Sequence, residues 1–170
     1  MNPRLIAQRG VTIIELMIVV AIGAVLAAIA IPGLRDTLNN TRQSTALGLV
    51  LSDLNQARSE AIKRNARMLV CAANAGGTDC SGSTNWSGGW LVCRQDDAVA
   101  TECEDSTLQD PNPVIVRPPV ADSLTLTSSA AVIRFFPNSS ASAATLTLGG
   151  TWSGAPNRTA NVAVTGHISK

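Results

Sequence analysis

The sequence predicts an α+β protein, in which one long N-terminal α-helix packs on a head built from an antiparallel β-sheet or sandwich. Three observations carry this prediction. Residues 16–31 contain no polar side chain, and an amphipathic helical pattern follows as far as residue 65. Beyond residue 67, short β-branched segments alternate with turn-forming residues, which is typical of antiparallel strands.

Four segments follow from these patterns. We expect a basic leader at 1–10, a transmembrane or filament-core helix at 11–31, an amphipathic helix at 32–66 and a β-rich head at 67–170. As a helix, the second segment spans about 30 Å, which matches the hydrocarbon core of a bilayer. The arginines of the leader keep the N-terminus cytoplasmic and direct the rest of the chain outward.

Glu15 is the one acidic residue inside the apolar stretch. A carboxylate within a membrane is expensive and needs a partner or a function. Cleavage between Gly10 and Val11 would create an α-amino group about one helical turn before Glu15. Because that amine is a cation at neutral pH, it can pair with Glu15 of the same subunit or of a neighbour. The cut would also remove Arg4 and Arg9, which are costly to draw into the membrane.

Two other interpretations of the N-terminus remain open. A secretory signal peptide fits the basic start and the small residues of Ala28-Ile29-Ala30, although Glu15 within the apolar stretch argues against it. An uncleaved membrane anchor is the second alternative, with Glu15 placed near the interface. The mature N-terminus distinguishes them, because a start at Ile31 or Met1 excludes cleavage after Gly10.

Pro32 and Gly33 punctuate the aliphatic run, and the amphipathic helix follows. Its apolar residues recur at a spacing of three or four, which predicts packing against the domain that follows. This stripe comprises Leu47, Val50, Leu51, Leu54, Ala57 and Ala61. Residues 36–44 are more polar, which indicates a stretch that projects between membrane and head.

Several candidate strands follow the helix, and prolines interrupt the middle of the head. The candidates are Met68–Ala72, Gly89–Arg94, Val114–Arg117, Leu124–Thr127, Ala131–Phe136, Ala144–Leu148 and Asn161–Ile168. No internal repeat is evident, so these strands predict a single β-rich head.

All four cysteines, Cys71, Cys80, Cys93 and Cys103, lie beyond the apolar segment. They form no closely spaced pair and the chain has one histidine, so we expect no metal site. An even number beyond a membrane-directed segment favours disulfides formed in an oxidising compartment. Three connectivities are possible. We favour Cys71 with Cys80 and Cys93 with Cys103, because both loops are short and rich in Gly, Ser, Asp and Thr, and buried free thiols are the alternative.

Charge and motif content argue against catalysis and against nucleic acid as a main partner. The formal net charge is +1, from 13 Lys and Arg against 12 Asp and Glu, so the chain has no global basic field. His167 stands near the C-terminus, where a lone histidine is usually a surface residue. The paired glycines are typical of turns rather than of a phosphate-binding loop. We therefore expect no enzyme and no cofactor.

Residues 9–16, Arg-Gly-Val-Thr-Ile-Ile-Glu-Leu, resemble the processing signal of type IV prepilins and type II secretion pseudopilins. Gly10 matches the residue before the cut, and Glu15 matches the acid at the fifth mature position. Val11 takes the place of the first mature residue, which is usually Phe in that family. The resemblance implies that a prepilin peptidase cleaves after Gly10 and methylates Val11. It also implies storage in the bacterial inner membrane with a periplasmic head, and extraction through an inner-membrane assembly platform, with Glu15 aiding docking.

Parts of the head resemble the GspH/FimT/FimU group of minor pilins and pseudopilins. The resemblance rests on residues 57–65, the segment 71–92, Ile133-Arg134-Phe135 with Pro137, and the segment 162–166. It implies a minor type IV pilin that helps to initiate pilus assembly or forms part of the tip complex. Its partners would be other minor and major pilins, and its final location the pilus at the cell surface. A minor pseudopilin of type II secretion and a DNA-uptake pilin are the alternatives.

The DNA-uptake members of this group carry a basic Gly-Arg-x-Arg motif near the C-terminus. The corresponding stretch here runs from Gly166 to Lys170, with His167 and Ser169 in place of the two arginines. Arg158, His167 and Lys170 are therefore weak candidates for phosphate contacts. Because each phosphate contact needs a positive charge, we expect DNA binding to be possible but weak and salt-sensitive.

Overall fold

A computed structural model describes residues 11–105 and 112–170 of the chain. The leader at 1–10, including Gly10, and the loop residues 106–111 lie outside the described residues. The chain forms two compact units, which divide between Leu38 and Asn39. Among the described residues, the first unit is helical and the second holds all the strands.

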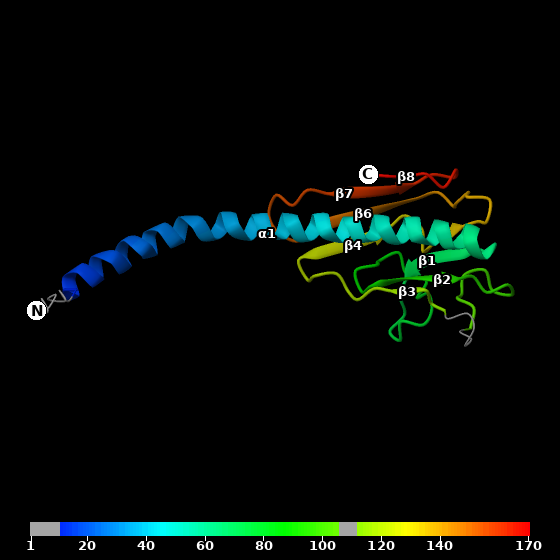
Figure 1. Ribbon diagram of the computed structural model, residues 1–170, viewed down its shortest axis with the longest axis horizontal. Helices are drawn as coiled ribbons and strands as arrows, with labels where there is room; N and C mark the ends of the chain where they lie inside the picture. Colours follow the sequence, from blue (N-terminus) through cyan, green and yellow to red (C-terminus); the bar gives the residue numbers. More distant parts are fainter. Residues whose placement is uncertain (1–10, 106–111) are drawn as a thin grey trace, which may run out of the picture. The chain divides into compact units, whose positions relative to one another are not determined.

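Helix α1 extends from Ile13 to Arg64 (Figure 1). It continues through Pro32 and Gly33, so the punctuation expected there does not end it. A single proline removes one backbone hydrogen bond, and the other turns of this helix of 52 residues retain theirs. Of the helices that the structure describes, α1 alone is long and apolar enough to cross a membrane.

Thr12 caps the start of α1. Its Oγ1 accepts a hydrogen bond from the backbone N–H of Glu15 at 3.3 Å, and its carbonyl accepts one from the N–H of Leu16 at 3.1 Å. A threonine three residues before a glutamate is the capping-box pattern. The cap places Glu15 in the first turn, where a negative charge interacts favourably with the positive end of the helix dipole.

Within residues 11–105 and 112–170, nothing covers the large apolar side chains at the start of α1. The large hydrophobic residues between Ile13 and Ile31 are 48–81 % exposed. A continuous apolar surface of this length marks contact with lipid or with other proteins. This part of α1 therefore needs either a membrane or neighbouring helices around it.

The second unit contains two four-stranded antiparallel sheets (Figure 1). The strands are β1 (Met68–Ala72), β2 (Trp90–Arg94), β3 (Ile115–Val116), β4 (Leu124–Ser128), β5 (Val132–Phe135), β6 (Ala144–Gly150), β7 (Arg158–Val162) and β8 (Ile168–Ser169). Their order is β3-β2-β1-β5 in the first sheet and β4-β6-β7-β8 in the second. The predicted α+β fold of a long helix and antiparallel sheets is confirmed.

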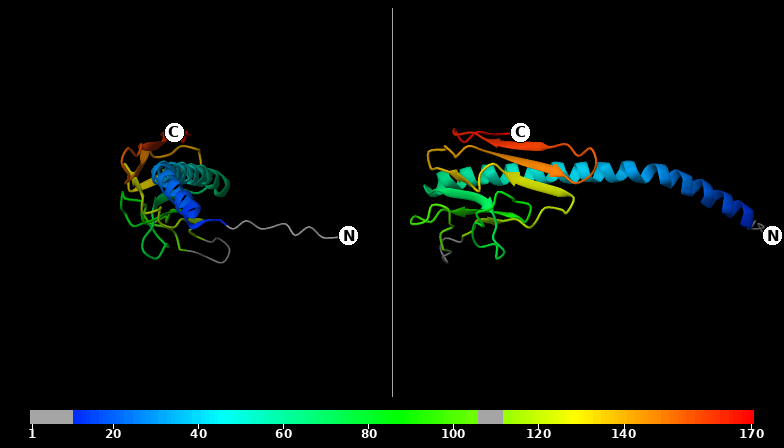
Figure 2. Two further views of the ribbon diagram at one scale, coloured as in Figure 1. Left: turned by 90° about the vertical axis from the view of Figure 1, so that its left-hand side faces the viewer. Right: turned by 180° about the vertical axis from the view of Figure 1, so that it is seen from behind.

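The core of the head forms between the last turns of α1 and both sheets, which lie along these turns in Figure 2. The helix contributes Leu47, Val50, Leu54, Ala57 and Ala61, all buried. Their spacing of three or four places them on one face of the helix, as the apolar stripe predicts. They share one hydrophobic cluster with side chains from both sheets.

Strand β1 is buried on both faces. Met68, Val70 and Ala72 face the main core, whereas Leu69 and Cys71 belong to a smaller cluster together with residues of β2 and the disulfides. This arrangement explains why the strand lacks the polar alternation of a half-exposed strand. The disulfide-bonded loops therefore cover the outer face of β1, which would otherwise contact solvent.

The single strand predicted at Asn161–Ile168 is wrong, because two strands and a turn occupy this region. β7 and β8 pair as an antiparallel hairpin, in which Val162 lies opposite Ile168. Gly166 allows the reversal with a φ of 75°, and its N–H donates to the carbonyl of Ala163 at 2.8 Å. β-branched residues within the turn continue the strand-like pattern, so the sequence does not show where β7 ends. β3 is also shorter than expected, with two residues.

Gly166→Ala is expected to lower the free energy of unfolding by more than about 1 kcal/mol. A Cβ at this position would lie 1.9 Å from the carbonyl oxygen of Ser139, in a backbone conformation that L-residues rarely adopt. Gly82→Ala is the matched control, because its φ is 71° but a Cβ there meets nothing within 4 Å. Urea denaturation of the full chain in detergent measures both, and equal losses would contradict the steric argument.

Candidate functional site

The predicted assembly residues lie at the start of α1. Val11 and Glu15 are both exposed, and Thr12 holds Glu15 one turn into the chain from Val11. In the uncleaved chain the nitrogen of Val11 is an amide, so the ion pair with Glu15 requires the cleavage and stays a prediction. Gly10 lies outside the described residues. α1 begins at Ile13, so Glu15 lies in its first turn and Val11 lies two residues before the helix.

The cysteines form two disulfides, Cys71–Cys80 and Cys93–Cys103, which is the pairing that the loop lengths favoured. The carboxylate of Asp79 joins the two loops. Its Oδ1 accepts hydrogen bonds from the backbone N–H groups of Cys80 at 2.6 Å and of Cys103 at 2.8 Å. All four sulfurs are bonded, so none is available as a thiolate ligand or nucleophile.

Asp53 is a buried acid that sequence reasoning missed. Its Oδ2 accepts hydrogen bonds from Trp90 Nε1 at 2.9 Å and from Arg117 Nε at 2.8 Å, and its Oδ1 accepts one from Arg117 Nη2 at 2.8 Å. The Asp53 side chain is 1 % exposed, against 34 % for Arg117. The hydrogen bond to Asp53 raises the pKa of the Arg117 guanidinium. Its signal in the sequence is an acid at helical spacing between Val50 and Ala57, within the apolar stripe.

Gln43 is a second buried polar residue of α1 that the sequence did not reveal. Its Nε2 donates to the carbonyls of Leu148 at 3.0 Å and Pro156 at 2.6 Å. Its Oε1 accepts a hydrogen bond from Arg158 Nε at 3.0 Å. Gln43 thus anchors α1 to the second sheet, as Asp53 anchors it to the first. Arg158, one of the candidates for DNA contacts, is half-buried in this contact.

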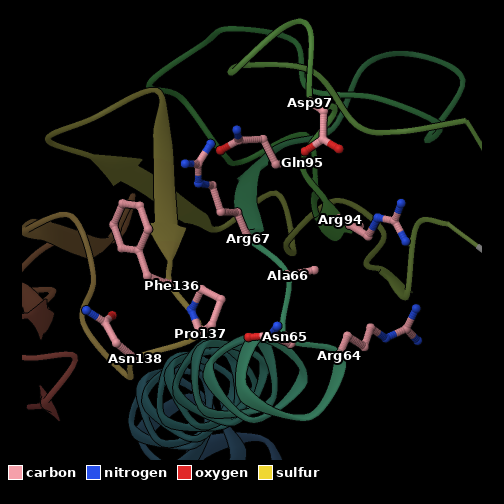
Figure 3. Close-up of a pocket in the computed structure, with 10 residues that line it drawn as sticks. All are labelled: Arg64, Asn65, Ala66, Arg67, Arg94, Gln95, Asp97, Phe136, Pro137 and Asn138. Carbon is pink, nitrogen blue, oxygen red and sulfur yellow. The ribbon is translucent and has the colours of Figure 1, made fainter.

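A cavity of about 600 Å³ lies where α1 ends, and arginines from three segments line it (Figure 3). Figure 3 shows Arg64 and Arg94 on one side and Phe136 on the other. Arg64 Nε donates to Glu60 at 2.7 Å, and Arg94 forms an ion pair with Glu104. The hydrogen bond from Arg64 lowers the pKa of Glu60. Carboxylates thus offset two of the arginines, and the cavity offers little net positive charge to a nucleic acid.

His167 and Lys170 are exposed at the C-terminal hairpin. They lie near β8, whereas Arg158 begins β7 and is held by Gln43. Of the three residues proposed from the sequence for phosphate contacts, two are therefore exposed and one is engaged within the head. DNA binding remains the weak possibility that the sequence predicts.

Comparisons with known proteins agree with this arrangement. The family described as type II transport protein GspH matches residues 46–166, and the prokaryotic N-terminal methylation motif matches residues 6–31. The fold is similar to the minor pilin FimU of Pseudomonas aeruginosa, with a TM-score of 0.56 and 16 % identity over 76 % of this chain and 88 % of that one. It is also similar to the minor pseudopilin EpsH of Vibrio cholerae, with a TM-score of 0.53 and 9 % identity over 75 % and 94 % of the two chains.

The two matches cover different parts of the chain. The methylation motif covers the exposed apolar helix and implies processing by a prepilin peptidase, and the family match covers the head. Such proteins are structural filament subunits rather than enzymes. The chain therefore belongs to the GspH family of type IV pilin-like proteins and is a minor pilin or pseudopilin with an N-terminal methylation motif.

Proposed function

We propose that this chain is a minor subunit of a type II secretion filament, anchored in the inner membrane until assembly. A prepilin peptidase cleaves it between Gly10 and Val11 and methylates Val11. The observation that supports this proposal best is the uncovered aliphatic helix at 13–31, which the methylation motif at 6–31 overlaps. Lipid covers this helix before assembly, and the helices of other subunits cover it in the filament.

The family match of the head favours the type II secretion filament over the type IV pilus. The family that matches residues 46–166 is described as a type II transport protein, which favours the pseudopilin over the pilus-tip role that the sequence analysis placed first. A minor type IV pilin is the second candidate, because the minor pilin FimU shares the fold. DNA uptake has the least support, since Gln43 holds Arg158 and carboxylates pair with Arg64 and Arg94.

Glu15 would act through the charge that cleavage creates. The new α-amino group is a cation next to a carboxylate in a medium of low dielectric constant, where each unpaired charge is costly. Pairing removes most of that cost, either within one subunit or between a new subunit and the one already docked. Neutralising Glu15 would leave the amine without a counter-ion.

Gly10→Val is expected to prevent processing and to abolish incorporation into filaments. Mass spectrometry of the wild-type chain should show a mature start at N-methylated Val11. Gly88→Val is the matched control, because Gly88 lies exposed in the head, away from the cut and from the N-terminal helix, and a Cβ there meets nothing within 4 Å. A mature wild-type start at Ile31 or Met1 would contradict the proposal.

A second experiment distinguishes the type II secretion filament from the type IV pilus. Immunoblots of filaments from strains that lack either the secretion assembly ATPase or the pilus assembly ATPase show which machine carries the chain. Loss of the chain only without the secretion ATPase supports the pseudopilin. Loss only without the pilus ATPase favours the minor pilin instead.

A further inference from the structure

The cavity at the end of α1 contains two polar groups that the head leaves without partners. The side chain of Gln95 is 4 % exposed, and its Oε1 accepts no hydrogen bond within residues 11–105 and 112–170. The guanidinium of Arg67, which lines the same cavity, forms no ion pair or hydrogen bond within those residues. A buried acceptor without a donor is costly, so Gln95 marks a place where a ligand can donate a hydrogen bond.

These two groups lie side by side. The backbone N–H of Gln95 donates to the carbonyl of Arg67 at 2.9 Å, which continues the antiparallel register of β1 and β2 beyond Met68 and Arg94. Residues opposite each other in such a register carry their side chains on the same face. Figure 3 shows the amide of Gln95 beside the guanidinium of Arg67, with both extending away from the end of α1. One ligand can therefore contact both groups.

The charges around the cavity favour a ligand with a single negative charge. Carboxylates offset the guanidiniums of Arg64 and Arg94, as described above, and Arg67 supplies a further positive charge. Asp97 also lines the cavity, and in Figure 3 Gln95 stands between Asp97 and Arg67. The carboxylate of Asp97 repels a second negative charge on the ligand, which disfavours phosphates and polyanions.

We propose that this cavity binds the C-terminus of a partner polypeptide. The last residue of a peptide carries a carboxylate and an N–H on the same Cα. The carboxylate binds the guanidinium of Arg67, while the N–H donates to Oε1 of Gln95. Phe136 and Pro137 line the cavity as well and provide an apolar surface for the last side chain. An internal peptide segment lacks the carboxylate and a phosphate lacks the N–H donor, so neither uses both groups.

Fluorescence anisotropy of a labelled peptide tests this site. The probe is the peptide Gly-Ser-Ala-Leu, with fluorescein at its N-terminus and a free C-terminal carboxylate, mixed with the full chain in detergent. We expect saturable binding with a Kd of about 100 µM, and binding at least about tenfold weaker when the C-terminus is amidated. Equal binding of the two peptides, or no saturable binding of either, would overturn the proposal.

Variants assign the binding to the two groups. Arg67→Leu is expected to weaken binding of the free-carboxylate peptide about tenfold, because it removes the cation. Arg42→Leu is the matched control, since it removes an exposed arginine of the head that lies outside the cavity. Gln95→Leu should weaken binding without lowering the free energy of unfolding, because it removes an acceptor that is unpaired in the free head. Urea denaturation measures that stability.

These variants can also contradict the proposal. Unchanged peptide binding by Gln95→Leu would show that its amide does not contact the ligand. Equal losses in Arg67→Leu and Arg42→Leu would show that the peptide responds to the charge of the chain rather than to the cavity.

Discussion

Asp53→Ala is expected to lower the free energy of unfolding of the head by about 3 kcal/mol. The substitution leaves the indole N–H of Trp90 without its acceptor in the core, and removes the counter-charge of Arg117. Arg117 is partly exposed and regains some solvation, which keeps the loss below that of a fully buried charge. Chemical denaturation of the full chain in detergent measures the change.

Two comparisons separate the charge from the hydrogen bonds. Asp53→Asn keeps an acceptor for Trp90 and should cost less than alanine. Asp122→Ala removes an exposed acid of the head and should change stability by no more than about 0.5 kcal/mol. If Asp53→Ala unfolds at the same denaturant concentration as Asp122→Ala, the buried network does not stabilise the head.

Arg117→Ala tests the same pair from the other side. It leaves the carboxylate of Asp53, which is 1 % exposed, with the indole of Trp90 as its one remaining partner among the contacts described here. The double variant with Asp53→Ala should therefore lose less stability than the sum of the two single variants.

Removing either disulfide is expected to lower the free energy of unfolding by about 2–4 kcal/mol. Each bridge closes a short loop, with 9 residues of separation in Cys71–Cys80 and 10 in Cys93–Cys103. The reduced chain regains the conformational freedom that the closed loops deny to the unfolded state. Denaturation with and without a thiol reductant measures the difference, and equal stability in both conditions would contradict it.

Because the sulfurs lie close together, the two cysteines of a bridge should be replaced at the same time. Those of Cys80, Cys93 and Cys103 all lie within 4.8 Å of one another. A single substitution such as Cys71→Ala would leave a Cys80 thiol that can attack the other disulfide. Replacing both cysteines of a bridge by alanine avoids this exchange. A variant with all four replaced is the control, because a reductant should not destabilise it further.

The sequence predicted those elements whose signals are local. The apolar run, the amphipathic stripe and most strands were found because their periodicity repeats over neighbouring residues. The hairpin of β7 and β8 was missed because β-branched residues continue through its turn, and Gly166 was its one mark. The disulfide pairing was likewise accessible, since both bridges close short loops.

The hydrogen bonds by which Asp53 and Gln43 hold α1 to the sheets could not be predicted from local sequence patterns. Asp53 lies 37 residues from Trp90 and 64 from Arg117 in the sequence, and Gln43 lies 115 from Arg158. These partners meet because of how the two sheets order their strands. The same contacts changed the interpretation of Arg158, which had been considered for phosphate binding and instead holds Gln43.

The sequence by itself determined the chemistry of the N-terminus. Val11 and Glu15 are four residues apart in the sequence, so their spacing alone predicts that an amine created at Val11 lies about one helical turn from the carboxylate. The tertiary structure alone decided how the head is held on α1, through the hydrogen bonds of Asp53 to the first sheet and of Gln43 to the second. These contacts join residues far apart in the chain, which only the packing of the helix against the two sheets brings together.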